Sequence, residues 1–259
     1  ERIKEVFMLS FDHPLSERVR SLIRIDHLFN RFNHNVESDD KWSHHVALSS
    51  LFEIMECSSR AELKLDILQE LERQKQMMVQ NRDRQSALLL QEDLKQVAQG
   101  LLGIQQKFGQ HLRENEWLMA IKQRMLVPGG TSPFDVPSYY YWQQRPFEER
   151  KADLQNWIRT LMPTYDAISV LLSILRKNSR EVNCFAKHGN YQHPSLAQNI
   201  HMLSIEVDEA DKAIPEVSAN KYFTHIRFLA VSDERLRGSQ LDQDIRFKMI
   251  MSSFDLVVE

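Results

Sequence analysis

The chain has 259 residues, 42% of them hydrophobic and 27% charged, which is the composition of a globular protein with one or two domains. Its formal net charge of −3 excludes nucleic-acid binding through bulk positive charge, so electrostatic recognition must come from a local patch. Two cysteines make no disulfide framework. No uninterrupted apolar run has the length of a membrane-spanning helix, and no signal-peptide pattern occurs, so we expect a cytoplasmic protein that binds no membrane.

The first two elements are a strand and a cationic helix. Residues 5–11 alternate, which places Phe7, Leu9 and Phe11 on one face and predicts a strand that Pro14 ends. Helical periodicity follows from Ser16, which is placed to cap the helix. Its apolar face comprises Val19, Leu22, Ile25, Phe29 and Phe32. The opposite face carries a row of cations, Arg20, Arg24, His27 and Arg31. Such a row indicates either an anionic partner or a solvated helix face.

Helical patterns continue to about residue 178. The second helix, 41–57, should bury Leu48, Leu51, Phe52 and Met55. A capping box at residues 59–62 opens the third helix, which runs to about residue 82 with a stripe of Leu63, Ile67, Leu71 and Met78. We expect it to pair with a helix at 85–107. A helix at 110–125, a loop at 126–137 with three of the eight prolines, and two helices that begin near Pro146 and Pro163 complete the region.

The chain changes character after about residue 180. β-like runs at 182–186, 200–207, 222–231 and 245–251 are separated by turn sequences. Helices followed by strands indicate the α+β class: a mostly helical domain and a smaller antiparallel β domain that includes the N-terminal strand. We therefore predict a helical domain at 15–179 and a β domain formed by 1–14 and 180–259.

The sequence contains no motif for a phosphate loop, a dinucleotide site, a nucleophile elbow or a zinc protease, so we expect no cofactor and no enzymatic activity. The alternative is a small-ligand or metal-dependent enzyme that uses His188, His193 and Cys184. The aromatic residues Tyr139–Trp142 could stack on a base or an apolar peptide. At least two of these four are more simply explained as core residues, and the charge balance disfavours nucleic acid as a partner.

Four segments together resemble the ZapD family of bacterial cell-division proteins. They are residues 11–26, which contain His13-Pro14-Leu15; residues 70–74, Glu-Leu-Glu-Arg-Gln; residues 109–114, Gly-Gln-His-Leu-Arg-Glu; and residues 123–137, which contain Pro-Gly-Gly and Phe-Asp-Val-Pro. Ile226-Arg227-Phe228 also fits, and the order of the segments holds from about residue 7 to residue 251.

The resemblance implies a cytoplasmic homodimer without enzymatic activity that acts at midcell. Proteins of this family bind the flexible C-terminal tail of FtsZ, the tubulin-like division GTPase, bundle its filaments and stabilise the Z ring. An acidic, disordered tail is expected to bind weakly at each contact, because it must become ordered. Arginine forks suit its carboxylates, and two sites in a dimer gain affinity on a filament that repeats the tail.

The resemblance also implies which residues hold the tail. Arg24, Arg60 and Arg227 match basic positions of the family, Lys221 lies near another, and Arg20 belongs to the same N-terminal stretch. Two further positions that are basic in relatives are occupied here by Glu116 and Tyr140. We therefore expect a pocket with fewer cations than in those relatives, formed where Arg24, Arg60 and Arg227 meet.

Overall fold

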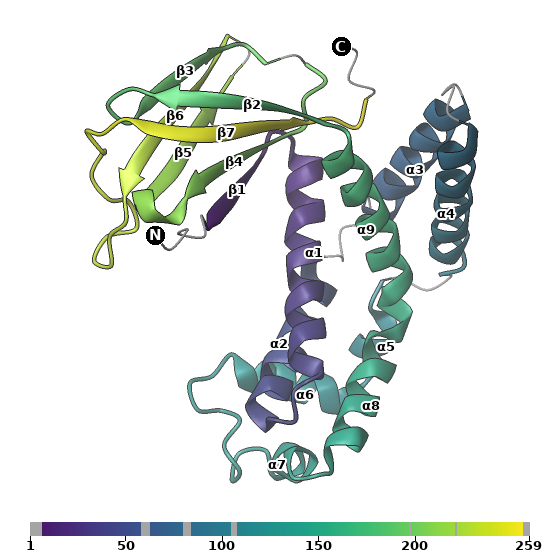
Figure 1. Cartoon of the computed structure of the whole chain (residues 1–259). Helices are drawn as coiled ribbons and strands as arrows, with labels where there is room; N and C mark the ends of the chain where they lie inside the picture. The colour runs from purple at the N-terminus through teal and green to yellow at the C-terminus, as the bar shows by residue number, and fades with distance from the viewer. Residues whose placement is uncertain are drawn as a thin grey trace, which may run out of the picture. The chain divides into compact units, whose positions relative to one another are not determined.

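The computed structural model describes residues 7–57, 63–79, 84–104, 108–196, 198–220 and 222–255. Its contacts divide the chain into two compact units (Figure 1). The β unit comprises Glu1–Arg20 and Ser173–Glu259, and the helical unit comprises Ser21–Leu172. Helices and antiparallel sheets occur together, with the N-terminal strand in a sheet, so the predicted α+β class is confirmed.

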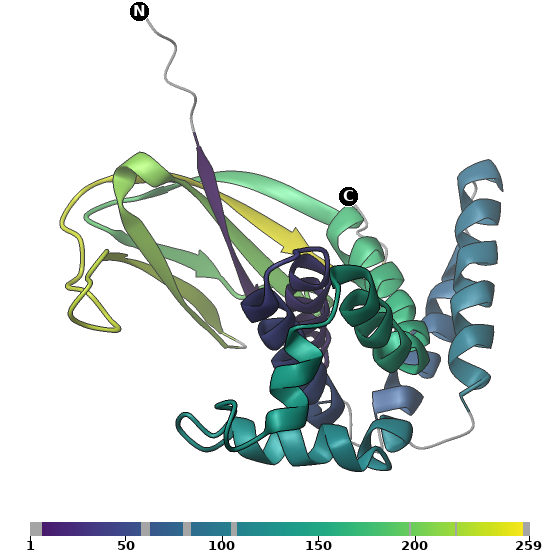
Figure 2. The same cartoon turned by 90° about the horizontal axis from the view of Figure 1, so that it is seen from below.

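The helical unit is built from consecutive helices joined by short connections. They are most of α1 (Glu17–Val36), α2 (Lys41–Cys57), α3 (Leu63–Val79), α4 (Arg84–Leu102), α5 (Gln110–Arg113), α6 (Glu116–Met125), α7 (Pro137–Gln143), α8 (Phe147–Ile158), η1 (Arg159–Leu161) and most of α9 (Met162–Lys177). The helices α3 and α4 lie side by side in both views, which confirms their predicted pairing (Figures 1 and 2).

The buried faces of α1 and α2 are those that the periodicity predicts. The Oγ atom of Ser16 accepts a hydrogen bond from the Val19 N–H at 3.3 Å and so caps α1. The ring of Phe29 stacks on Tyr165 with centroids 4.7 Å apart. All nine predicted core positions of the two helices are buried: Val19, Leu22, Ile25, Phe29, Phe32, Leu48, Leu51, Phe52 and Met55.

Two predicted helix boundaries differ from the structure. The helix expected at 110–125 is divided into α5 and α6, because the side chain of Asn115 accepts a hydrogen bond from the Leu118 N–H at 3.0 Å and starts a new helix there. The helix expected at 85–107 ends at Leu102. The capping box predicted at residues 59–62 lies outside the described residues.

The aromatic run at 139–142 is divided between core and surface. Tyr139 and Trp142 are buried and stack with centroids 5.8 Å apart, and Trp117 and Trp157 pack against Trp142. The rings of Tyr140 and Tyr141 are exposed. The interpretation of two of the four as core residues is therefore confirmed.

The segment Phe147–Lys177, which contains α8, η1 and α9, is long and apolar enough to cross a membrane by length and composition. This differs from the expectation that no segment of the chain has that property. Half of its most apolar window is buried inside the protein, as in the core helix of a globular domain. Its buried residues include Ile158, Ile168 and Leu171.

The β unit contains two antiparallel sheets. The first has the order β1-β4-β7-β2, with β1 (Met8–Pro14), β4 (Met202–Asp208), β7 (Ile245–Ser252) and β2 (Ser179–Ala186). The second has the order β3-β6-β5, with β3 (Asn190–Pro194), β6 (Phe223–Ala230) and β5 (Ala213–Ala219), and a short helix η2 (Glu209–Asp211) precedes β5. The N-terminal strand belongs to the β domain, as predicted, and it pairs with β4, with Leu9 opposite Val207.

The inward faces of both sheets form one apolar core. It contains Ala186, Leu203, Ile205, Val207, Ala213, Ile226, Phe228, Ile245, Phe247 and Met249. Leu9 and Phe11 of β1 pack against this core. Phe7 was expected on the same face, but it precedes the strand and remains 65% exposed.

Candidate partner-binding site

The cationic row on α1 is shorter than predicted. The side chains of Arg20, Arg24 and His27 are exposed. Arg31 is half-buried and donates hydrogen bonds to Ser50 Oγ at 2.8 Å and to Glu53 Oε1 at 2.5 Å, both on α2. Its guanidinium therefore helps to pack α1 against α2, and the exposed row ends one turn earlier.

The first residue of the row contacts neighbours along its own helix and strand. Arg20 Nη1 lies 3.4 Å from Glu17 Oε2, and Arg20 Nη2 lies 3.5 Å from the carbonyl oxygen of Pro14. Burial and the positive charge of Arg20 lower the pKa of His13. Arg20 belongs to the β unit, whereas Arg24, one turn later in the same helix, belongs to the helical unit.

The clearest exposed cationic cluster is on the outer face of the second sheet. Arg227 in the middle of β6 stands opposite Glu216 of β5, and the two side chains form an ion pair. The other carboxylate oxygen, Glu216 Oε1, lies 3.1 Å from Nε of Arg237, in the loop between β6 and β7. One carboxylate thus contacts two guanidinium groups, and the cluster keeps a net positive charge.

Exposure differs among the three members of this cluster. The side chain of Glu216 is only 23% exposed, whereas those of Arg227 and Arg237 are 46% and 76% exposed. The carboxylate is therefore the more enclosed centre, and the two cations face solvent. Sequence reasoning missed Arg237, because it lies in an irregular loop with no periodicity that would assign it to a face.

The remaining predicted positions are less informative. Arg60 and Lys221 lie outside the described residues. Glu116 is in the first turn of α6, where a carboxylate interacts favourably with the helix dipole. Tyr140 is exposed on α7. The structure brings Arg227 together with Arg237; a common pocket with Arg24 and Arg60 stays a prediction.

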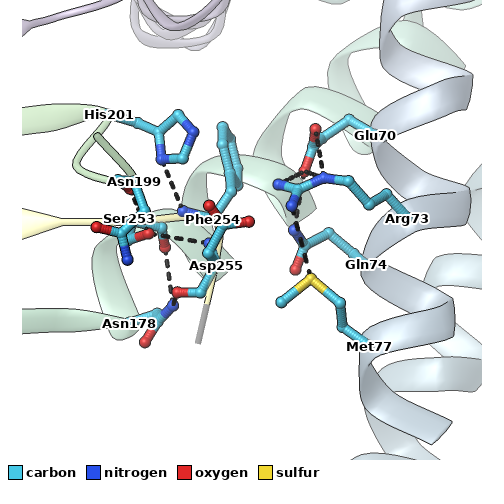
Figure 3. Close-up of polar contacts among 10 residues, drawn as sticks. All are labelled: Glu70, Arg73, Gln74, Met77, Asn178, Asn199, His201, Ser253, Phe254 and Asp255. Carbon is cyan, nitrogen blue, oxygen red and sulfur yellow. Dashed lines mark hydrogen bonds and ion pairs between the residues drawn. The ribbon is translucent and has the colours of Figure 1, made fainter. Parts of the chain in front are cut away.

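Three polar residues on α3 hydrogen-bond to one another within this helix. Arg73 donates from Nη2 to Glu70 Oε1 at 2.7 Å, and Gln74 Nε2 donates to the same oxygen at 2.8 Å (Figure 3). The Nη1 atom of Arg73 contacts the sulfur of Met77 at 3.7 Å. These contacts orient the side chains of Glu70, Arg73 and Gln74, which belong to one of the segments that carry the family resemblance.

A second polar cluster, within the β unit, fixes the end of β7. Asn178 Nδ2 donates to the carbonyl oxygens of Ser253 and Asp255 (Figure 3). The Phe254 N–H donates to His201 Nδ1 at 3.1 Å, and Ser253 Oγ donates to the carbonyl of Asn199 at 2.5 Å. The chain after β7 is therefore held by the side chains of Asn178 and His201 and by the backbone carbonyl of Asn199.

The three residues of the alternative enzyme site have separate partners. His188 Nδ1 lies 2.8 Å from Asp242 Oδ1, His193 Nδ1 contacts the Pro194 carbonyl oxygen at 2.8 Å, and Cys184 Sγ donates to the Val182 carbonyl oxygen. Within the described ranges, no group of three or more His, Cys, Asp or Glu side chains could hold a metal ion. The geometry therefore gives no support to a metal-dependent activity.

The helical unit also contains a cavity of about 350 Å³. Its lining is Phe32, Asn33, Val36, Glu37, Gln155, Ile158, Arg159 and Met162. The one carboxylate of this lining, on Glu37, already pairs with Lys151 at 2.6 Å. Half of the eight lining residues are apolar and half are polar or charged, and they include no acid–base pair for catalysis.

Comparison with known proteins identifies the family. The family model of the cell division protein ZapD matches residues 23–227. The chain belongs to the ZapD family. The ZapD protein of Chromobacterium violaceum is 43% identical over 252 residues, which are 95% of this chain and 100% of that protein. The ZapD protein of Janthinobacterium sp. (strain Marseille) is 41% identical over the same shares of both chains.

A third ZapD protein, from Aromatoleum aromaticum, is 38% identical over 251 residues. The aligned residues are 95% of this chain and 98% of that protein. The relatives match along nearly their whole length, so the likeness includes both units. ZapD proteins are cell-division factors and not a known enzyme family, which gives this chain a role in cell division at the division site.

Proposed function

We propose that the chain is a cytoplasmic, non-enzymatic homodimer that binds the C-terminal tail of FtsZ at midcell, cross-links FtsZ filaments and stabilises the Z ring. Membership of the ZapD family supports a role in division. The observation that carries the binding proposal is the exposed cationic cluster on the second sheet, where Arg227 is accompanied by a second arginine.

The chemistry of this cluster suits an acidic tail. Guanidinium groups make charge-assisted hydrogen bonds to carboxylates, and two of them side by side can bind two oxygens of one group or two neighbouring acidic residues. The contacts are exposed, so each is expected to contribute little alone. Two such sites in a dimer gain effective concentration on a filament that presents many tails, which is the requirement for cross-linking.

The first test is filament bundling. Purified protein is mixed with FtsZ and GTP, and bundles are measured by sedimentation and light scattering. We expect bundling that disappears when the FtsZ tail is deleted, and a dimer by analytical ultracentrifugation. Bundling that survives deletion of the tail, or FtsZ filaments that are unchanged by the protein, would contradict the proposal.

The second test locates the site. Arg24→Glu, Arg60→Glu and Arg227→Glu should each weaken binding of an FtsZ tail peptide about tenfold, because each places a like charge beside the acidic ligand. Arg235→Glu is the matched control, since Arg235 has no ion pair within the described residues. Circular dichroism checks the fold, and binding should weaken as salt rises. Salt-independent binding, or equal loss in the control, would exclude an electrostatic site at these residues.

A further inference from the structure

On the outer face of the second sheet, the position of Arg227 is fixed by strand pairing. The pairing of β6 with both neighbours places Arg227 between Asn190 of β3 and Glu216 of β5. Because β6 is the central strand of this sheet, the backbone of Arg227 is flanked by a paired strand on each side. Its guanidinium is therefore presented outward from a fixed point of the sheet.

The loop after β6 returns to this sheet and brings Arg237 with it. The Leu241 N–H donates to the Phe228 carbonyl at 2.9 Å, and the Ala230 N–H donates to the Ser239 carbonyl at 2.9 Å. A Cβ atom on Gly238 would lie 1.9 Å from the carbonyl oxygen of Ala230, so only glycine permits this approach. The residue before this glycine is Arg237, whose position is therefore fixed by backbone contacts.

The carboxylate of Glu216 contacts only one nitrogen atom of each of the two guanidinium groups. Arg227 contacts it through Nη2 and Arg237 through Nε. In the described part of the chain, the other nitrogens of these two groups make no further hydrogen bond, and the side chains are 46% and 76% exposed. Since each guanidinium has five N–H donors, most of them remain available to a second carboxylate.

We propose that Glu216 is an internal competitor in a carboxylate-binding site formed by Arg227 and Arg237, and that it limits the affinity of this site for an acidic peptide. This inference rests on the proposed function, because the peptide is the FtsZ tail. Its carboxylates bind the same two guanidinium groups that Glu216 holds. The internal ion pairs are exposed and individually weak, so a ligand can share or replace them at small cost.

The role of Glu216 has a clear electrostatic consequence. The cluster has a net charge of +1 with Glu216 ionised, and neutralising this side chain leaves two positive charges facing the ligand. A weaker site with fast release suits a cross-linker that binds through many repeated contacts. Arg237 is thereby a further binding residue that the family motifs do not indicate.

The test measures binding of a fluorescent FtsZ tail peptide by anisotropy at low and high salt. Glu216→Gln keeps the size of the side chain, and we expect it to tighten binding about threefold or more. Arg237→Gln should weaken binding about threefold, and Arg235→Gln in the same loop should leave it unchanged. In the Arg237→Gln background, the gain from Glu216→Gln should shrink, because the two residues act on one site.

The outcomes separate the inference from the function on which it rests. If the wild-type chain binds the peptide but neither Glu216→Gln nor Arg237→Gln changes the affinity, the inference is wrong and the proposed function stands. If the wild-type chain and Glu216→Gln both fail to bind, the proposed function and the inference are overturned together. A tail peptide with Asn and Gln in place of its acidic residues should bind no variant.

Discussion

Two arginine clusters, one in each unit, use the same side chain in opposite ways. In the helical unit, Arg150 of α8 is only 5% exposed, and its guanidinium contacts several groups. It donates to the carbonyl of Arg145, to Nδ1 of His44, and to both the carbonyl and the carboxylate of Asp39, each at 3.0 Å. In the β unit, Arg227 and Arg237 share one carboxylate and face solvent.

The difference shows how burial decides what a cation does. A buried guanidinium must have its donors satisfied inside the protein, because water cannot replace a lost partner. Arg150 therefore uses four of its five N–H donors inside the protein and joins α8 to α2 and to the segment that precedes it. An exposed guanidinium loses little when one partner leaves, so the cluster in the β unit can exchange an internal carboxylate for an external one. Stability and binding should consequently respond to different substitutions.

The largest effect on stability is expected from Arg150→Gln. It removes four hydrogen bonds and leaves Nδ1 of the buried His44 without its donor, whereas the exposed Asp39 can turn to water, so we expect the free energy of unfolding to fall by about 2–4 kcal/mol. Urea denaturation followed by circular dichroism measures this change. Arg227→Gln is the comparison variant and should change stability by less than about 0.5 kcal/mol. Equal losses in both variants would contradict the contrast between the clusters.

A substitution in the loop of the β unit should affect stability and binding together. Gly238→Ala places a methyl group against the Ala230 carbonyl, and the loop must move. We expect a loss of about 1–3 kcal/mol in the free energy of unfolding and weaker binding of the tail peptide, because Arg237 is displaced. Ser239→Ala, which keeps the neighbouring backbone, is the control. Unchanged binding in a destabilised Gly238→Ala would show that Arg237 does not contribute.

A smaller effect should appear with pH, and it should come from His44 and His45 of the helical unit together with His13 of the β unit. Arg150 can only donate, so His44 Nδ1 accepts from it and Nε2–H donates to the Val36 carbonyl at 3.2 Å. Burial and the charge of Arg150 lower the pKa of His44 below its ordinary value of 6.5, against the opposing effects of the Val36 carbonyl, Asp39 and Asp40. Burial also lowers the pKa of His45.

The sign of the pH effect follows from these directions. A histidine with a lowered pKa in the folded state binds fewer protons than in the unfolded state, so its stabilising contribution is present above pH 6.5 and decreases as pH falls. We expect the melting temperature to fall between pH 7.5 and pH 5.5. His45→Asn should reduce this dependence, whereas His27→Asn, on the exposed face of α1, should not. A melting temperature that is constant over this range would contradict the assignment.

The smallest effect is expected at the exposed start of α1. Glu17→Gln removes the ion pair with Arg20, which lies on the helix surface at a spacing of three residues. Such pairs contribute about 0.5 kcal/mol or less to the free energy of unfolding. Thermal unfolding at low salt measures the change, and high salt should abolish it. A loss above about 1 kcal/mol would show that Arg20 has a structural role comparable to that of Arg150.

The parts of the fold that periodicity specifies were predictable from the sequence. The bounds of α2 and the buried faces of α1 and α2 follow from apolar spacing alone. The strands β3 and β5 were missed because each contains a proline, Pro194 and Pro215, and β3 in addition has only five residues. The break between α5 and α6 depends on one side-chain cap, which a continuous helical pattern conceals.

The candidate site was less predictable because its members meet only through tertiary structure. Arg227 was indicated by family resemblance, but its pairing with Glu216 depends on the register between β5 and β6. Arg237 reaches the same carboxylate through a loop that carries no periodic signal. Arg31 is the opposite case, a residue that the sequence assigns to the exposed cationic row but the structure does not. Its hydrogen bonds to Ser50 and Glu53 of α2 hold its side chain against that helix.

The pairing of β1 with β4 has a consequence for biosynthesis. The partner of residues 8–14, residues 202–208, is translated almost two hundred residues after them. The helical unit, residues 21–172, is complete before that point and can fold while translation continues. Until β4 is made, the apolar side chains of Leu9 and Phe11 in the nascent chain have no core to pack against. We therefore expect this short segment to be prone to aggregation during synthesis and to be a binding site for a chaperone.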